Sequence, residues 1–382
     1  MKKFHRILGG IAGIMLVATL CGCGDKVNTT SSGSQIPSSS MSAPPKKSQD
    51  DIDYAVDRAL YYPYEDVKES YLLVNGEPYP YVNLKPDQDP MREGEIQIDK
   101  KGTTVTVKKF LTDHSNCVGG ALPVDAAHRT AVLAYGSNRA PSALRQKFSL
   151  LSGFQRGWSV VPVLKAKLAD FEVVHAAHYY GNGNLPATIQ YAKGVESEVF
   201  VTLLDHDELK RMDETEGVDR GAQRGWYHYA KLDNIKLEVD KGTPMSAVYV
   251  YIDNYGAVAL DGKTFALEKV RGTAVSSKES QKKILEMTEH YVESVKASKE
   301  DSRTCDPDSY PGIRGFVCAT FIDPCVRAGR TAALKGEHRK HFMKPPPESH
   351  ITYKVDPDTT TASGNPDSYP WEYRCPHDPY EE

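Results

Sequence analysis

Stretches rich in β-branched and aromatic residues between residues 131 and 255 constrain the fold of this chain most. Four of them have the pattern of strands: Val132–Tyr135, Ala187–Tyr191, Glu198–Leu203 and Ala247–Ile252. Helical patterns occur at Pro141–Phe148, Asp205–Glu216 and Lys278–Lys296. Because strands outnumber helices and alternate with them irregularly, we expect an α+β fold, a mixed barrel-like sheet with flanking helices.

Residues 1–22 have the features of an export signal. Three basic residues precede an apolar stretch, Ile7–Leu20, that is too short for a transmembrane helix, which needs about 20 residues. The stretch ends in Leu20-Cys21-Gly22-Cys23, which resembles the bacterial lipobox with Cys23 as the lipidated residue. An ordinary cleaved signal or a buried helix is the alternative. The resemblance implies an extracytoplasmic protein that is lipid-anchored to a bacterial membrane.

The composition divides the rest of the chain into four parts. Residues 23–50 hold the lipidated cysteine and a flexible Ser- and Pro-rich tether, and residues 51–128 form a β-rich N-terminal segment. Residues 129–300 form the central domain, and residues 301–382 a Cys- and Pro-rich segment that we expect to be a loop-rich appendage. Export permits disulfides, but the spacing leaves their pairing open among Cys117, Cys305, Cys318, Cys325 and Cys375.

The charge balance argues against nucleic acid as a partner. Without the three basic residues of the signal, the chain has 44 basic and 51 acidic residues. A mildly acidic protein lacks the concentrated basic face that binding to a phosphate backbone needs. His175 and His178 are the one pair with a possible metal-ligand spacing, but on an extended segment residues three apart face opposite sides.

The first candidate for chemistry is the turn that follows the first central strand. The strand Val132–Tyr135 leads into Gly136-Ser137-Asn138, and a helix is expected to begin near Pro141. Glycine lets the backbone approach a ligand closely, and successive N–H groups near a helix start accept anions. An ordinary turn has the same residues, so the motif alone does not decide.

The second candidate is a glutamate at the end of the helix expected at residues 206–217. Leu209, Met212 and Glu216 share one helical face, so Glu216 is expected on the core side of the last turn, before Gly217 ends the helix. The negative helix end and the loss of water would both raise the pKa of this carboxyl, as suits a proton carrier. The alternative is a side chain that curls to solvent.

Together the two motifs resemble the gamma-glutamylcyclotransferases over roughly residues 129–271. The family implies a compact barrel-like fold and an intramolecular ring closure, in which a gamma-glutamyl group forms 5-oxoproline and releases an amino acid or amine. The resemblance makes Glu216 the catalytic general acid/base. It assigns the binding of a small gamma-glutamyl substrate to Leu133, Ala134, Tyr135, Gly136, Ser137, Asn138 and Tyr227. It implies no metal and no cofactor, because the substrate carries its own nucleophile.

Two positions depart from the family pattern. Arg139 replaces a residue that is usually apolar, and Thr264, followed by Phe265, stands near the place of a second family tyrosine. A lost hydroxyl affects substrate recognition more than ring closure. The alternative function is therefore a non-catalytic surface module that uses the same fold to bind a gamma-glutamyl, peptide or protein ligand.

Overall fold

The computed structural model describes residues 47–115, 128–149, 154, 156, 158–218, 225–295, 305–334, 339–340 and 344–355. The predicted signal and lipobox, including Cys23, lie outside these residues, as do Cys117 and Cys375. Within the described ranges, no helix has both the length and the apolar character needed to cross a membrane.

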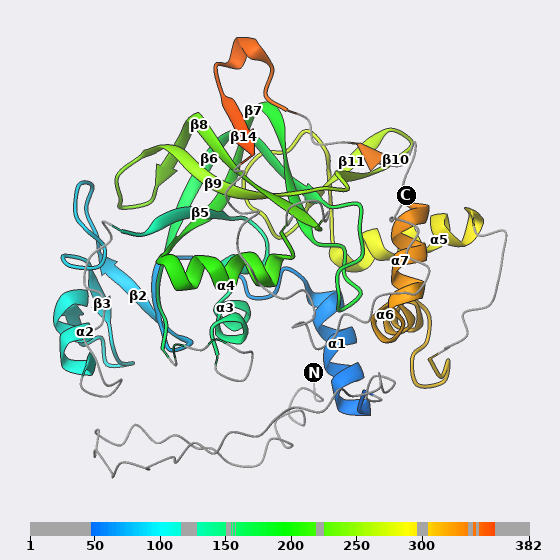
Figure 1. Ribbon diagram of the computed structural model, residues 1–382, viewed down its shortest axis with the longest axis horizontal. Helices are drawn as coiled ribbons and strands as arrows, with labels where there is room; N and C mark the ends of the chain where they lie inside the picture. The colour runs from blue at the N-terminus through cyan, green and yellow to red at the C-terminus, as the bar shows by residue number, and fades with distance from the viewer. Residues whose placement is uncertain are drawn as a thin grey trace, which may run out of the picture.

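The described chain contains helices and strands in mixed order (Figure 1). The α-helices are α1 (Gln49–Tyr61), α2 (Val107–Ser115), α3 (Pro141–Lys147), α4 (His206–Glu216), α5 (Gln281–Val295), α6 (Ile313–Ile322) and α7 (Pro324–Ala333), with short 3-10 turns η1 (Ser137–Arg139) and η3 (Pro347–Ser349). The strands are β1 (Tyr71–Val74), β2 (Glu77–Asn83), β3 (Glu95–Gln97), β4 (Thr104–Thr106), β5 (Thr130–Ala134), β6 (Val160–His175), β7 (Ala187–Leu204), β8 (Tyr227–Val239), β9 (Met245–Asp253), β10 (Ala257–Leu260), β11 (Lys263–Leu267), β12 (Ser277–Glu279), β13 (Arg339–Lys340) and β14 (Thr352–Val355).

Five strands close into a barrel. β5 pairs with β7, β7 with β6, β6 with β8 and β8 with β9, all antiparallel. The ring closes where β9 runs parallel to β5, with Val132 opposite Tyr249. This mixed barrel with flanking helices confirms the fold class that the strand pattern predicts.

Side chains on the two faces of β5 pack into different clusters, as the two-residue repeat of a strand requires. Leu133 belongs to the cluster that includes Leu164 and Val250 of other barrel strands. Val132 belongs to a second cluster, with Leu144 of α3 and Met212 of α4. The second cluster fixes α3 and α4 against the barrel, and these two helices carry much of the candidate site.

The N-terminal segment extends the barrel sheet and adds helices that the sequence analysis did not predict. Strand β1 pairs with barrel strand β6, and β2, β3 and β4 follow as antiparallel neighbours. The segment opens with α1, whose start Ser48 caps together with Asp51. Val56 and Ala59 lie on its buried face. Tertiary packing of this face explains why the helix forms although the tyrosine-rich sequence does not predict it.

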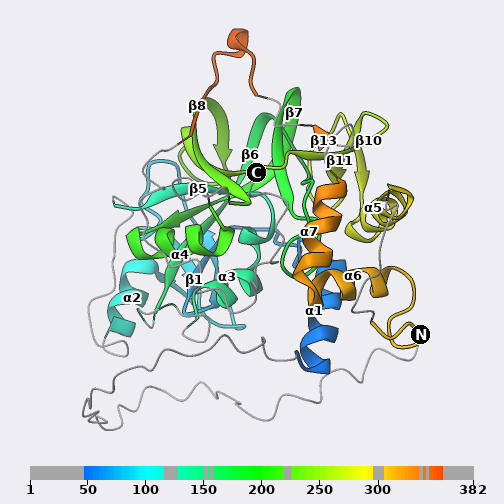
Figure 2. The same ribbon diagram turned by 45° about the vertical axis from the view of Figure 1, so that its right-hand side comes forward.

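The C-terminal segment is less loop-rich than expected, because it contains two ten-residue helices. The run Ile313–Ile322 is apolar and free of proline and forms α6, and the Asp323 side chain then caps α7 by accepting from two backbone N–H groups. Together with α1 and α5, these helices form one side of the molecule (Figure 2), which we call the helical layer. A disulfide joins Cys305 to Cys318 within this layer.

Candidate active site

The Gly136-Ser137-Asn138 turn lies where β5 leaves the barrel. The side chains of the three residues before it, Leu133, Ala134 and Tyr135, are buried. The Tyr135 hydroxyl donates to the carbonyl oxygen of Tyr251 on β9, which fixes the strand end. A 3-10 turn follows at Ser137–Arg139, and Pro141 then starts α3, as the sequence predicts.

Helix α4 is held at its first turn by a buried ionic cluster. Glu208 is fully buried and lies 2.8 Å from a guanidinium nitrogen of both Arg129 and Arg156. It also accepts the Val160 N–H at 2.9 Å, which ties the helix to the start of β6. Burial raises the pKa of Glu208 although two guanidiniums flank it. At the other end, Gly217 adopts the left-handed conformation with φ 59° and stops the helix, as predicted.

Glu216 meets the turn of the first motif in the last turn of α4. The Asn138 side-chain amide donates to Glu216 Oε1 at 3.0 Å, although the two residues are 78 positions apart. The Glu216 side chain is 12% exposed, so it lies toward the core, as its helical face predicts. The buried Oδ1 atom of Asn138 has no partner among the described residues, which leaves an acceptor next to the carboxylate.

Lys147 is a site residue that the sequence analysis missed. Its ammonium forms an ion pair with Glu216, and the side chains are 13% and 12% exposed. Lys147 occupies the last turn of the helix that begins at Pro141. The helix predicted at Pro141–Phe148 was the available signal for its position. The partner of Lys147 is in another element and has no signal in the sequence.

Buried tyrosines surround this carboxylate. The Tyr227 hydroxyl donates to the Ala187 carbonyl at 3.3 Å, and the Ala187 N–H donates to the Tyr62 hydroxyl at 2.9 Å. The Tyr251 hydroxyl donates to Asp213 at 2.5 Å. Burial raises the pKa of each of these phenols, and the negative charge of Glu216 adds to the effect. The tyrosines are therefore neutral hydrogen-bonding groups over the physiological range of pH.

The two departures from the family pattern have different environments. Arg139 is 1% exposed, donates to the Lys269 carbonyl at 3.1 Å, and has a pKa lowered by burial. Thr264 accepts from Gln190 at 3.1 Å, and the same amide donates to Glu172 at 3.1 Å. Thr264 thus belongs to a separate buried polar network, and no hydrogen bond joins it to Glu216 in the described part of the chain.

The two histidines with metal-ligand spacing, His175 and His178, contact different partners. His175 Nε2 bonds to the Glu279 carbonyl at 3.1 Å, while His178 Nδ1 lies 2.6 Å from Asp253 and its ring stacks on Trp226. Among the residues that the structure describes, no three His, Cys, Asp or Glu side chains come together in a way that holds a metal ion.

Comparisons with known proteins return two distant structures. No protein-family model matches the chain, and no curated protein matches it. A solved structure described as a gamma-glutamyl cyclotransferase is 17% identical, with a TM-score of 0.26 over 47% of this chain and 92% of its own. An uncharacterized protein from Homo sapiens is 19% identical, with the same TM-score over 47% of this chain and 93% of its own. At these values, the fold assignment rests on the strand pairings of the barrel rather than on either match.

Proposed function

We propose that the protein is a gamma-glutamylcyclotransferase-like enzyme with Glu216 as general acid/base. The observation that carries this proposal is the hydrogen bond between Asn138 and Glu216, which joins the Gly-Ser-Asn turn to the glutamate helix. A substrate ammonium placed here meets two acceptors, the Glu216 carboxylate and the buried Asn138 Oδ1. Backbone N–H groups of the neighbouring turn supply donors for a carboxylate or for a developing oxyanion.

The proposed reaction needs no partner besides the substrate. Glu216 takes a proton from the alpha-ammonium, and the freed amine attacks the gamma-carbonyl carbon of the same molecule. The new carbon–nitrogen bond closes the ring as the bond to the leaving nitrogen breaks. Overall, two protons leave the ring nitrogen and two reach the leaving nitrogen, with the carboxyl of Glu216 carrying them. Folding the substrate chain so that nitrogen meets carbonyl is proximity catalysis.

The test uses the purified full chain in detergent. The substrates are gamma-glutamyl dipeptides, glutathione and gamma-glutamylamines, and 5-oxoproline is followed by mass. Glu216→Gln keeps the shape but does not accept the proton, so we expect turnover to fall by at least about 100-fold. Glu214→Gln is the matched control, since Glu214 lies on the same helix and pairs with Arg211. Equal turnover by wild type and Glu216→Gln contradicts the proposal.

The second candidate is a non-catalytic module that binds gamma-glutamyl ligands. The ion pair with Lys147 favours it, because the Lys147 ammonium already pairs with the Glu216 carboxylate that a substrate ammonium would need. Calorimetric titration with 5-oxoproline and gamma-glutamyl dipeptides separates the two functions. Binding without turnover by the wild-type chain supports the module, and turnover excludes it.

We also propose that the protein acts outside the cytoplasm, anchored through lipid on Cys23. The lipobox-like sequence supports this, and the Cys305–Cys318 disulfide fits an oxidising compartment. The mass of the N-terminal peptide from membranes tests it, and Cys23→Ser should release the protein from the membrane fraction.

A further inference from the structure

Tyr62 contacts the site from outside the central domain. It follows α1 directly, and its side chain is 6% exposed. Its hydroxyl oxygen accepts the Ala187 N–H at 2.9 Å. The hydroxyl also lies directly against Gly136, where an added Cβ would collide with it. The phenol therefore stands at the turn that the proposed function uses for anion binding.

The Tyr62 hydroxyl retains its proton for donation. The bond from Ala187 uses the oxygen as acceptor, and no acceptor for the O–H is found within the described residues. Burial holds the pKa of Tyr62 well above its ordinary value, so the group stays neutral. An oxygen that accepts amide hydrogen bonds makes its own O–H a stronger donor, because hydrogen bonds in a chain polarise one another.

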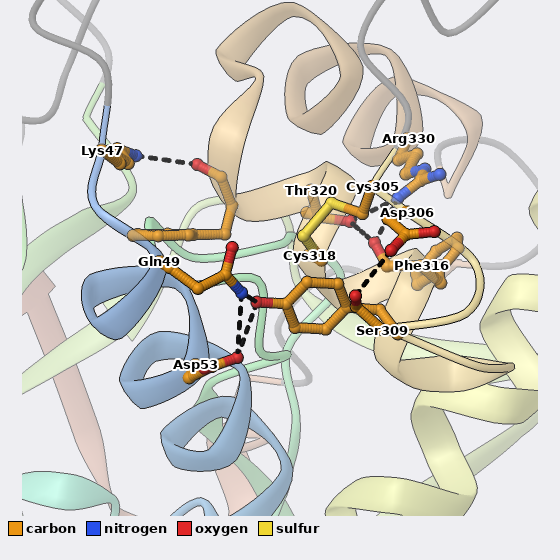
Figure 3. The surroundings of a disulfide bond; sticks show 12 residues. Lys47, Gln49, Asp53, Cys305, Asp306, Ser309, Phe316, Cys318, Thr320 and Arg330 are labelled. Atoms are coloured by element: carbon orange, nitrogen blue, oxygen red, sulfur yellow. Dashed lines mark hydrogen bonds between the residues drawn. A yellow bond between two sulfur atoms is a disulfide. The ribbon is translucent and has the colours of Figure 1, made fainter.

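Tyr62 is held in place from the helical layer. The Tyr310 hydroxyl donates to Asp53 of α1 at 2.6 Å, and Arg314 of α6 pairs with Asp57 of α1 at 2.6 Å. Figure 3 shows Gln49 and Asp53 of α1 beside the segment that the Cys305–Cys318 disulfide staples. The mobile elements of enzymes have few buried contacts, whereas this helix buries Val56 and Ala59 completely. These contacts hold α1, and with it Tyr62, in a fixed position. A hydrogen-bond donor needs such a position, whereas a residue that blocks the site and must move away would not be held in this way.

We propose that Tyr62 donates its hydroxyl hydrogen bond to the oxygen on which negative charge develops during ring closure. The inference rests on the proposed function and adds one catalytic residue to it. The Ala187 amide acts through the phenol, which it orients and polarises.

The test compares Tyr62→Phe with wild type in the full chain, with gamma-glutamyl dipeptides as substrates and 5-oxoproline as readout. Removing one preorganised donor to an oxyanion lowers kcat by about 100-fold, and we expect KM to change far less. Tyr64→Phe is the matched control, because Tyr64 is buried two residues away and its hydroxyl accepts a 3.4 Å bond from Asn182, which is outside the Gly-Ser-Asn turn. Thermal melting checks that both variants fold.

The outcomes separate the inference from the proposed function. An active wild type with unchanged kcat in Tyr62→Phe overturns the inference alone. A rise in kcat in Tyr62→Phe also overturns it, because the hydroxyl then obstructs the substrate. A wild type without turnover contradicts the proposed function, and the inference falls with it. Fluorotyrosine at position 62 alone, which strengthens the donor and preserves the ring, should alter kcat, whereas a packing role would leave it unchanged.

Discussion

Lys147, in the last turn of α3, forms an ion pair with Glu216, in the last turn of α4. The pair links the two helices that flank the Gly-Ser-Asn turn, and Asn138 of that turn donates to the same carboxylate oxygen. The proposed catalytic group is therefore fixed by side chains from two elements. Fixing a carboxylate in this way limits its rotamers, which general acid/base catalysis requires.

The ion pair should contribute to stability in a way that a double-mutant cycle detects. Lys147→Met leaves a largely buried carboxylate short of one charged partner, so we expect the free energy of unfolding to fall by about 1–3 kcal/mol. In the background of Glu216→Gln the same change should cost about 1 kcal/mol less, because no charge is then left behind. Urea denaturation measures all four proteins. Lys210→Met, on the exposed face of α4, is the control, and strictly additive losses would show that the pair is not coupled.

Gly136 should tolerate alanine better when the Tyr62 hydroxyl is absent. An alanine Cβ at position 136 would collide with the Tyr62 oxygen. We expect Gly136→Ala to cost about 1–3 kcal/mol of stability, as overpacking does. In Tyr62→Phe the nearest ring atom is Cζ, at 3.6 Å from that Cβ, while Ala187 Cβ remains at 3.2 Å, so part of the loss should be recovered.

Thermal and urea unfolding of the single and double variants check this prediction. Gly181→Ala is the control, since nothing lies within 4 Å of a Cβ at that position. A double variant as unstable as the sum of both single variants would mean that the Tyr62 hydroxyl does not limit the space at Gly136.

The parts of the site that the sequence predicted are those with local signals. The strand before Gly136, the helix start at Pro141 and the helix end at Gly217 all follow from residues within a few positions of each element. Glu216 was placed on the core side by helical periodicity alone. Lys147 and Tyr62 were missed because their roles depend on tertiary contacts, and a lysine in a helix end or a tyrosine after one predicts nothing specific. The strand pattern likewise predicted the fold class. It did not predict the helical layer, because contacts between distant segments hold its helices.

The Cys305–Cys318 disulfide should stabilise the helical layer more than the barrel. It closes a loop with a sequence separation of 13. Loss of a cross-link that closes a loop of this size lowers the free energy of unfolding by about 3 kcal/mol in the chain-entropy model. In the variant with both cysteines changed to serine, we expect faster amide hydrogen exchange in α1 and α6 and unchanged exchange in β5–β9. Faster exchange throughout the barrel would mean that layer and barrel unfold as one unit.

His175 should make the protein less stable in mild acid. Burial lowers its pKa from 6.5 to about 4 in the folded state, while the Glu279 carbonyl bonds to its Nε2. Between these values the unfolded chain binds a proton that the folded chain does not, so stability falls as the pH drops from about 6.5 to about 4 and is unaffected above that window. The contribution reaches about 3 kcal/mol at the acid end, at 1.4 kcal/mol per pKa unit.

Urea denaturation of wild type and His175→Gln at pH 7 and pH 4.5 isolates this contribution from the other groups that titrate in acid. Glutamine retains a donor for the Glu279 carbonyl but takes up no proton, so the variant should lose less stability between the two pH values than wild type does. His206→Gln, at the exposed start of α4, should follow wild type at both. Equal pH dependence in wild type and His175→Gln would show that His175 takes up its proton equally well in the folded and the unfolded state.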